Sequence, residues 1–222
     1  AAPIDGILTR LANSASVVRF KKLSIIGLRA TVELAKEVLG PKHGGQAERL
    51  AEVSKDTPLI TVVGGKLIAR GEITPDLLLN HEEFRAEVFN KFLEERTGEL
   101  PSSGRPNSVL LGLVAALQPV DPDRDDFVAK AAVFLSLSPD QIHDGLDFLE
   151  GREVLVRVGG KLRIVPDLFA DYLLELASIY PDGRPKGYAD AVFTIFESTH
   201  LVNLLRNFGE LEWRFTRDGK DS

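Results

Sequence analysis

The sequence contains no cysteine and no methionine, and its four histidines stand far apart, at positions 43, 81, 143 and 200. Without cysteine there is no disulfide framework and no thiolate metal site, and the histidines show no metal-ligand spacing. No run of about 18 apolar residues is present, so we expect no membrane-spanning helix. With no secretory leader either, the sequence predicts a cytoplasmic protein that has neither a metal site nor a membrane partner.

Common catalytic motifs are absent as well. The phosphate-binding loop reads G-x-x-x-x-G-K-[ST], but leucine follows the lysine in both Gly-Gly-Lys sequences, at 64–66 and 159–161. Neither G-x-S-x-G nor H-E-x-x-H occurs. We therefore expect no catalytic residue in this chain, and no cofactor bound by it alone.

What is present is a globular composition with an uneven distribution of charge. The chain has 222 residues and is 44% hydrophobic, and because it starts at Ala1 and lacks methionine we expect a partial or processed chain. Residues 19–70 hold ten Lys/Arg against five Asp/Glu, a net charge of +5, whereas residues 71–182 hold ten against twenty-one, a net charge of -11. This division favours either docking of a basic module on an acidic one or an anionic ligand for the basic module.

Helical periodicity predicts a small basic helical bundle over residues 24–97. Ser24 is expected to cap the first helix, which Gly40 and Pro41 would end. Thr57 and Pro58 have the residue types of an N-cap and a first-turn proline. The predicted helices cover residues 24–39, 46–53, 58–70 and 81–96, with a short turn starting at Thr74-Pro75.

The glycine pair in the third of these helices needs its own explanation. Gly64 and Gly65 each cost about 1 kcal/mol relative to alanine inside a helix. Either close packing against a neighbour or ligand, or a kink in the helix, would account for them.

Residues 138–174 organise the second half of the chain, because they read in order as helix, strand, turn, strand and helix. That is the order of a winged helix, and with helices predicted at 107–117 and 125–137 it gives a winged-helix domain over 107–180. Ser138 and Pro139 mark the start of its third helix as an N-cap and a first-turn proline.

The wing of this domain is expected to be a β-hairpin with a three-residue loop at 159–161. That loop would pair Val156 with Ile164 and Val158 with Leu162 on a buried face. It would set Arg157 opposite Arg163 on the outer face. An anion or an acidic group near the two arginines would relieve their repulsion. An ordinary solvated pair is the simpler interpretation.

The remaining segments complete the predicted domain organisation. Residues 1–23, which contain a strand at 17–20, would be the end of a truncated core domain. Residues 98–107 and 181–187 are rich in proline and glycine and are predicted linkers. Residues 188–222 would begin a helical repeat or scaffold region. The expected fold class is mainly α.

This order of parts resembles the lid and winged-helix portion of the STAND-class P-loop NTPases, which are related to AAA+ proteins and include bacterial antiviral defence proteins. Thr57-Pro58-Leu59 matches the family's lid motif, whose proline starts a helix packed against the base of the nucleotide. Asp56 replaces the glycine that usually stands two residues before that proline. Arg10, within Ile7-Leu8-Thr9-Arg10, resembles the sensor arginine. The resemblance implies that these four residues, Arg10, Thr57, Pro58 and Leu59, contact nucleotide.

The resemblance also assigns a regulatory position in the winged helix. Val165-Pro166-Asp167-Leu168 stands where the family often has a His-Asp pair, whose histidine reads the phosphate of the nucleotide. Pro166 replaces that histidine, whereas Asp167 can still cap the following helix. The resemblance implies ATP or ADP with Mg²⁺ as cofactor of the parent protein, and the NTPase core of the same polypeptide or a homo-oligomer as partner.

Three functions follow as hypotheses. The first is a regulatory lid and winged-helix portion of a nucleotide-dependent signalling ATPase, with defence among its roles by analogy. The second is a DNA-binding protein of initiator type, in which Arg157, Lys161 and Arg163 of the wing would contact the phosphate backbone. Residues 138–151, which should enter the groove, contain four acidic residues and no Lys or Arg, and this disfavours nucleic acid as a partner. The third is a nucleotide-independent interaction scaffold.

Overall fold

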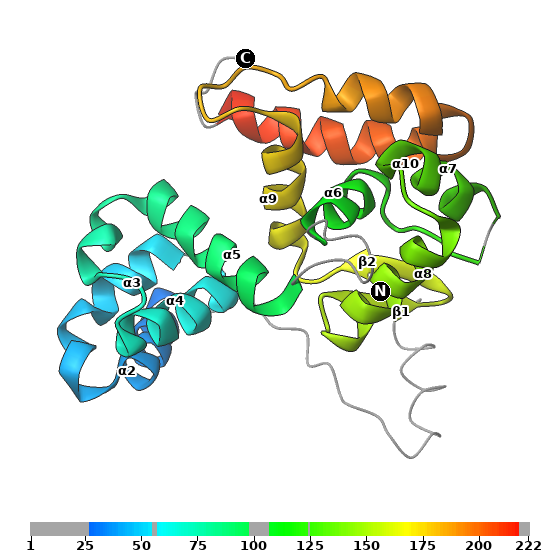
Figure 1. Cartoon of the computed structure of the whole chain (residues 1–222). Helices are drawn as coiled ribbons and strands as arrows, with labels where there is room; N and C mark the ends of the chain where they lie inside the picture. The colour runs from blue at the N-terminus through cyan, green and yellow to red at the C-terminus, as the bar shows by residue number, and fades with distance from the viewer. Residues whose placement is uncertain (1–26, 55–56, 98–106, 124, 218–222) are drawn as a thin grey trace, which may run out of the picture. The chain divides into compact units, whose positions relative to one another are not determined.

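The computed structural model describes residues 27–54, 57–97, 107–123 and 125–217 (Figure 1). The chain separates into two compact units, Ala1–Arg85 and Ala86–Ser222. The described residues are mainly helical and include one two-stranded antiparallel sheet, which confirms the predicted helical class. None of their helices combines the length and the apolar character needed to cross a membrane. The predicted core end at 1–23, with Arg10, and nearly all of the predicted linker at 98–107 lie outside the described residues.

In the described part of the first unit, α2 (Leu28–His43) packs against both α3 (Ala47–Ser54) and α4 (Pro58–Arg70). The N-cap of α2 is Gly27, in an extended conformation, and the predicted cap Ser24 lies outside the described residues. Gly40, at φ 68°, interrupts α2 before Pro41, close to the predicted end. Buried apolar residues of all three helices form the core, among them Ala35, Leu39, Leu50, Val53, Ile60, Leu67 and Ile68.

Helix α4 begins where its sequence predicts. Pro58 is its first residue and Thr57 its N-cap, although the Thr57 side chain makes no capping hydrogen bond. The helix continues through Gly64 and Gly65, both of them buried. A Cβ atom added at Gly65 would lie 2.8 Å from Cγ1 of Val38 on α2. Close packing of α2 on α4 therefore explains this glycine.

The unit ends in the short 3₁₀ helix η2 (Pro75–Leu79) and the first turn of α5 (His81–Thr97), and the division between the units falls inside α5. Phe84 is fully buried, and the Arg85 Nε donates to the Val53 carbonyl at 3.1 Å. The rest of α5 packs within the second unit, where the Phe89 and Phe92 rings lie 5.8 and 5.1 Å from the Phe169 ring. Apolar residues of α5 thus take part in the packing of each unit.

The second unit is organised around α6 (Ser108–Leu117), in which every residue from Leu110 to Leu117 is buried. Helices α9 (Asp167–Ser178) and α10 (Tyr188–Arg217) pack on α6, and α7 (Asp125–Leu135) packs on α8 (Pro139–Gly151). Ser138 caps α8 as predicted, in a capping box with Gln141.

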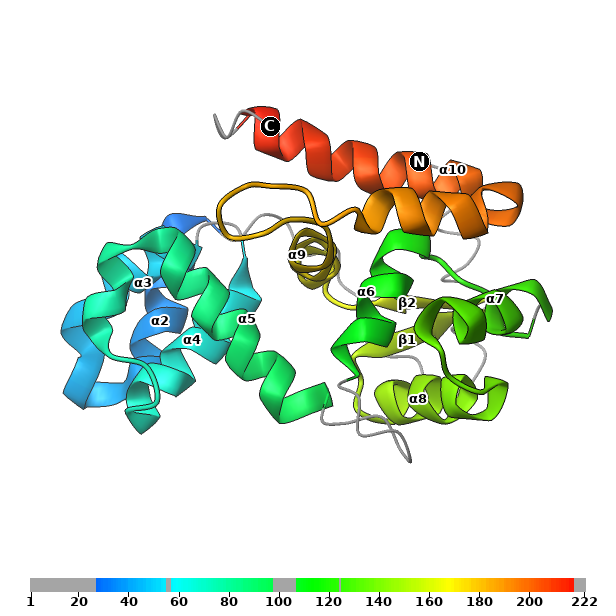
Figure 2. The same cartoon turned by 45° about the horizontal axis from the view of Figure 1, so that its top comes forward.

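Helix α10 is a helical hairpin, because non-helical φ/ψ at His200 divide it into two antiparallel segments that lie side by side (Figure 2). The Phe193 and Phe208 rings, one from each segment, are 5.6 Å apart. We call residues 201–217 the C-terminal arm.

The hairpin of β1 (Leu155–Val158) and β2 (Lys161–Ile164) turns through two residues, so the predicted three-residue loop is wrong. Gly159 and Gly160 have φ values of 59° and 82°, and a two-residue hairpin turn of type I′ needs positive values at both central positions. Arg157 therefore stands opposite Leu162, and the predicted pairing of Arg157 with Arg163 is wrong.

The new register also changes which valines are buried. Leu155, Leu162 and Ile164 face the core, whereas Val156 and Val158, predicted on the buried face, are 38% and 64% exposed. Lys161 and Arg163 share that outer face, because each stands opposite one of the two valines.

A third segment extends the sheet beyond β2. The backbones of Val120 and Leu162 exchange two hydrogen bonds, of 2.7 and 3.0 Å. Nearby, the Ile164 N–H donates to Oε1 of Gln118 at 2.9 Å. Strand β2 is thus held on both sides.

Candidate functional site

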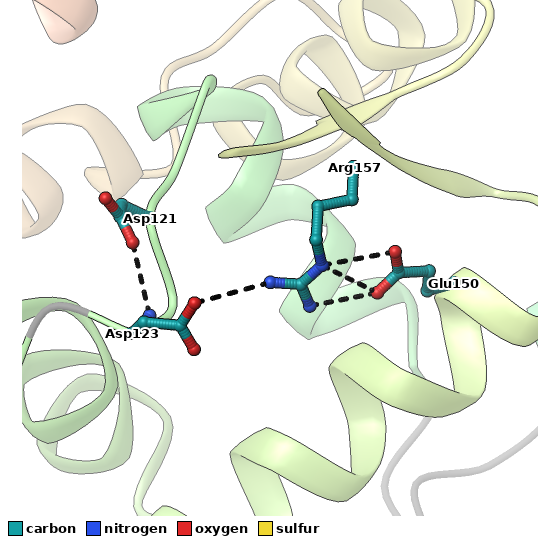
Figure 3. Close-up of polar contacts among 4 residues, drawn as sticks. All are labelled: Asp121, Asp123, Glu150 and Arg157. Atoms are coloured by element: carbon teal, nitrogen blue, oxygen red, sulfur yellow. Dashed lines mark hydrogen bonds and ion pairs between the residues drawn. The ribbon is translucent and has the colours of Figure 1, made fainter. Parts of the chain in front are cut away.

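Arg157, on the core-facing side of the hairpin, is held by carboxylates (Figure 3). Its Nε lies 3.2 Å from both carboxylate oxygens of Glu150 on α8, and its Nη2 lies 2.9 Å from Oε2. Nη1 is 3.8 Å from Oδ2 of Asp123 in the α6–α7 connection. The hydrogen bond with Glu150 raises the pKa of the Arg157 guanidinium. The arginine is therefore fully charged, but its charge is balanced inside the unit.

Arg163, on the outer face of β2, is paired as well. Its Nη2 donates to Oδ1 of Asp167 at the start of α9. The prediction that Asp167 caps this helix is wrong, because the N-cap is Pro166 and Asp167 is the first helical residue. An aspartate in the first turn still interacts favourably with the helix dipole. Arg163 and Asp167 thus form a bridge from the hairpin to α9.

Of the three cations predicted to form a basic surface on the wing, Arg157 and Arg163 are neutralised by carboxylates, which leaves Lys161. Lys161 is exposed, and within the described part of the chain it has no ion-pair partner. Arg157 and Arg163 project from opposite faces of the hairpin, because they are an odd number of steps apart in the observed pairing. The structure does not bring the three predicted contacts together.

Helix α8 adds negative charge beside this hairpin. Its exposed ionisable residues are Asp140, His143, Asp144 and Asp147, and the helix contains no Lys or Arg. Asp147 lies near enough to contribute to the raised pKa of Arg157. The surface formed by α8 and the hairpin is therefore acidic, with neutralised arginines.

The predicted nucleotide contacts Thr57, Pro58 and Leu59 lie together in the first unit, at the start of α4. All three are half-buried. The Thr57 N–H donates to the Ser54 carbonyl at 3.0 Å, and its own carbonyl accepts from Ile60. This first turn of α4 carries no acidic residue and no side-chain cap, so it stays electropositive. Arg10, the fourth predicted contact, lies outside the described residues.

A cleft of about 340 Å³ in the second unit was not predicted from the sequence. Arg163 and Asp167 line it from one side, and Arg206 and Glu210 of the C-terminal arm line it from the other. Because the cleft presents both cations and carboxylates, it does not select for one sign of ligand charge.

Two asparagines of the C-terminal arm fix its position at this cleft. Asn203 Nδ2 donates to the Leu117 carbonyl at 2.8 Å, and Asn207 Nδ2 donates to the Ala116 carbonyl at 2.9 Å. Both carbonyls belong to the last turn of α6, where backbone acceptors lack helical partners. The sequence signal for this docking is a pair of asparagines, four residues apart, on the buried face that also holds Leu204 and Leu211.

Comparison of the chain with protein-family models, with curated proteins and with solved structures finds no match. What the chain does is therefore inferred from its own residues and their geometry.

Proposed function

We propose that this chain is the regulatory lid and winged-helix portion of a nucleotide-dependent signalling ATPase, and that it acts through protein contacts. The first unit would be the lid and the second the winged helix. ATP or ADP with Mg²⁺ would be held by an NTPase core of the same polypeptide. Nucleotide state would bias a two-state arrangement of these parts, as in other nucleotide switches.

The order of elements in the second unit supports the winged-helix assignment. Helices α6, α7 and α8 are followed by β1, β2 and then α9. Val120, in the connection after α6, pairs with β2 as a short third strand would. A helical domain with a small antiparallel sheet is the architecture that this assignment requires.

The observation that carries the proposal is the neutralisation of the two wing arginines. Duplex binding depends on Lys and Arg at phosphates, and each such contact contributes to the salt dependence of affinity. Here Arg157 is paired with Glu150 and Arg163 with Asp167. The helix that would enter a groove, α8, presents carboxylates instead of cations. A winged helix with this surface favours a protein partner.

The start of α4 supports the assignment of the lid. Its first turn is half-buried, carries no acidic residue and begins at the proline that matches the lid motif. The positive end of a helix dipole is a favourable neighbour for phosphate. The net charge of +5 over residues 19–70 is consistent with the same role.

A mobility shift with random duplex DNA at low salt tests the choice between protein and nucleic acid. We expect no tight binding by the wild-type chain. The variant Glu150→Gln with Asp167→Asn should gain weak, salt-sensitive binding, because it releases both arginines without changing their positions. Tight, salt-sensitive binding by the wild type, lost on Arg157→Ala with Arg163→Ala, would establish the DNA-binding function instead.

A further inference from the structure

The cleft of about 340 Å³ in the second unit combines charged sides with an apolar floor. Three of its lining residues, Ala115, Ala170 and Leu174, are each only 2% exposed and therefore lie at its base. Clefts of about 300–1,000 Å³ with an apolar lining and a few polar groups are typical sites for small molecules. The polar groups at this cleft determine which small molecule it suits.

The charged groups on the side of β2 and α9 already have partners. Arg163 donates to Asp167, and both line the cleft. Asp171 lines it as well and is engaged in an interaction of its own. A ligand is therefore expected to find its charged partners on the opposite side, which the C-terminal arm supplies.

The arm presents one cation and one carboxylate to the cleft. Arg206 and Glu210 stand four residues apart, a spacing at which opposite charges on a helix commonly pair. Both line the cleft, and neither forms an ion pair or a hydrogen bond within the part of the chain that the structure describes. The cleft thus offers an uncommitted guanidinium and an uncommitted carboxylate side by side.

Two amide side chains of the lining have one polar atom left over. Gln118 Oε1 accepts from the Ile164 N–H at 2.9 Å, and Asn207 Nδ2 donates to the Ala116 carbonyl at 2.9 Å. Among the described residues, Nε2 of Gln118 and Oδ1 of Asn207 form no hydrogen bond. A neutral donor and a neutral acceptor therefore accompany the two charges of the arm.

We propose that this cleft binds a free amino acid with an aliphatic side chain, such as leucine. The ligand carboxylate pairs with Arg206, because a guanidinium binds a carboxylate through two hydrogen bonds, and the ligand ammonium pairs with Glu210. The aliphatic side chain lies on the apolar floor. A simple anion would leave Glu210 unpaired beside it, and a simple cation would leave Arg206 unpaired, whereas a zwitterion satisfies both.

This site goes beyond the proposed nucleotide-dependent function. Arg206 and Glu210 belong neither to the predicted nucleotide contacts nor to the wing, and amino-acid binding requires no NTPase core. Failure of the ligand experiment would therefore leave the proposed function untouched.

Isothermal titration calorimetry of the chain with L-leucine and two analogues tests the proposal. Isocaproate has the same carbon skeleton without the amino group, and isoamylamine has it without the carboxylate. We expect leucine to bind and each analogue to bind at least about tenfold more weakly, because each loses one charge-assisted contact.

Variants of the arm locate the binding. Arg206→Gln and Glu210→Gln should each weaken leucine binding at least about tenfold. Glu197→Gln is the matched control, because Glu197 is also an exposed glutamate of α10 but does not line the cleft, and this variant should bind leucine as the wild type does. Circular dichroism verifies that each variant stays helical.

Four results would overturn the proposal. The first is a wild-type chain that binds no leucine up to the solubility limit of the ligand. The second is equal affinity for leucine and both analogues, which would show a site indifferent to both charges. The third is unchanged leucine affinity in both Arg206→Gln and Glu210→Gln, and the fourth is an equal loss of affinity in the control Glu197→Gln.

Discussion

The packing of α4 on α2 predicts an unusual response to a helix-favouring substitution. Replacing glycine by alanine inside a helix normally stabilises it by about 1 kcal/mol. At Gly65, however, the new Cβ would lie 2.8 Å from Cγ1 of Val38 and 3.2 Å from Cδ2 of Leu50. Valine in a helix has essentially one χ1 rotamer, so it cannot turn away. Overpacking of this kind costs about 1–3 kcal/mol, and Gly65→Ala should therefore destabilise the chain by up to about 2 kcal/mol.

Urea unfolding followed by helical circular dichroism measures this effect, and a second background identifies its cause. In Val38→Ala the obstructing methyl group is gone, so Gly65→Ala should become stabilising there. Gly45→Ala is the matched control in the same unit, because a Cβ at Gly45 meets nothing within 4 Å, and it should change stability by less than about 0.5 kcal/mol. Stabilisation by Gly65→Ala in the wild-type background would refute the close packing of α2 on α4.

Three further experiments test contacts in the second unit. Ser138→Ala should cost about 1 kcal/mol in chemical denaturation, because it removes the acceptor of the α8 capping box. A double-mutant cycle on Arg157 and Glu150 should give a coupling energy below about 1 kcal/mol that shrinks with added salt, since both side chains are 32% exposed; a coupling that is independent of salt would contradict this. Burial, followed by the Lys130 charge, lowers the pKa of His200 below its ordinary 6.5. The unfolded state then binds a proton more readily, so stability is full above about pH 6.5 and falls as the pH drops toward the folded-state pKa; His200→Gln should flatten this part of the pH profile.

The helix boundaries were largely predictable because their signals are local. Pro58 and Pro139 each begin a helix where the sequence places a first-turn proline. The break in α2 at Gly40 follows from the same kind of signal, a glycine before a proline. Such signals depend on the backbone preferences of one or two residues, so tertiary contacts rarely override them.

The register of the hairpin was not predictable from the pattern of apolar residues. That pattern favoured burying Val156 and Val158, whereas the turn chemistry of Gly159-Gly160 favoured a two-residue loop. The turn set the register, and the two valines became exposed because Leu155 occupies the core in their place.

The carboxylates that pair with Arg157 and Arg163 of the wing could not be identified from the sequence either. Glu150 and Asp123 are 7 and 34 positions from Arg157 in the sequence, and the fold brings both carboxylates to it, one from α8 and one from the α6–α7 connection. Asp167 was expected to cap its own helix, but its carboxylate forms an ion pair with Arg163 on the neighbouring strand. Sequence reasoning identified the charged residues without the contacts that determine their role.

The central claim, that α4 begins at the wall of a nucleotide site, is tested most directly at Pro58. Pro75 is the matched control, because it is also a half-buried proline that follows a threonine at the start of a helical segment. Each proline-to-alanine change should lower the stability of the chain by about 1 kcal/mol or less. ADP affinity is then measured in the longer polypeptide, with its NTPase core, that we propose. The account predicts at least about a tenfold loss of affinity for Pro58→Ala and no change for Pro75→Ala, whereas equal affinities in the two variants would contradict it.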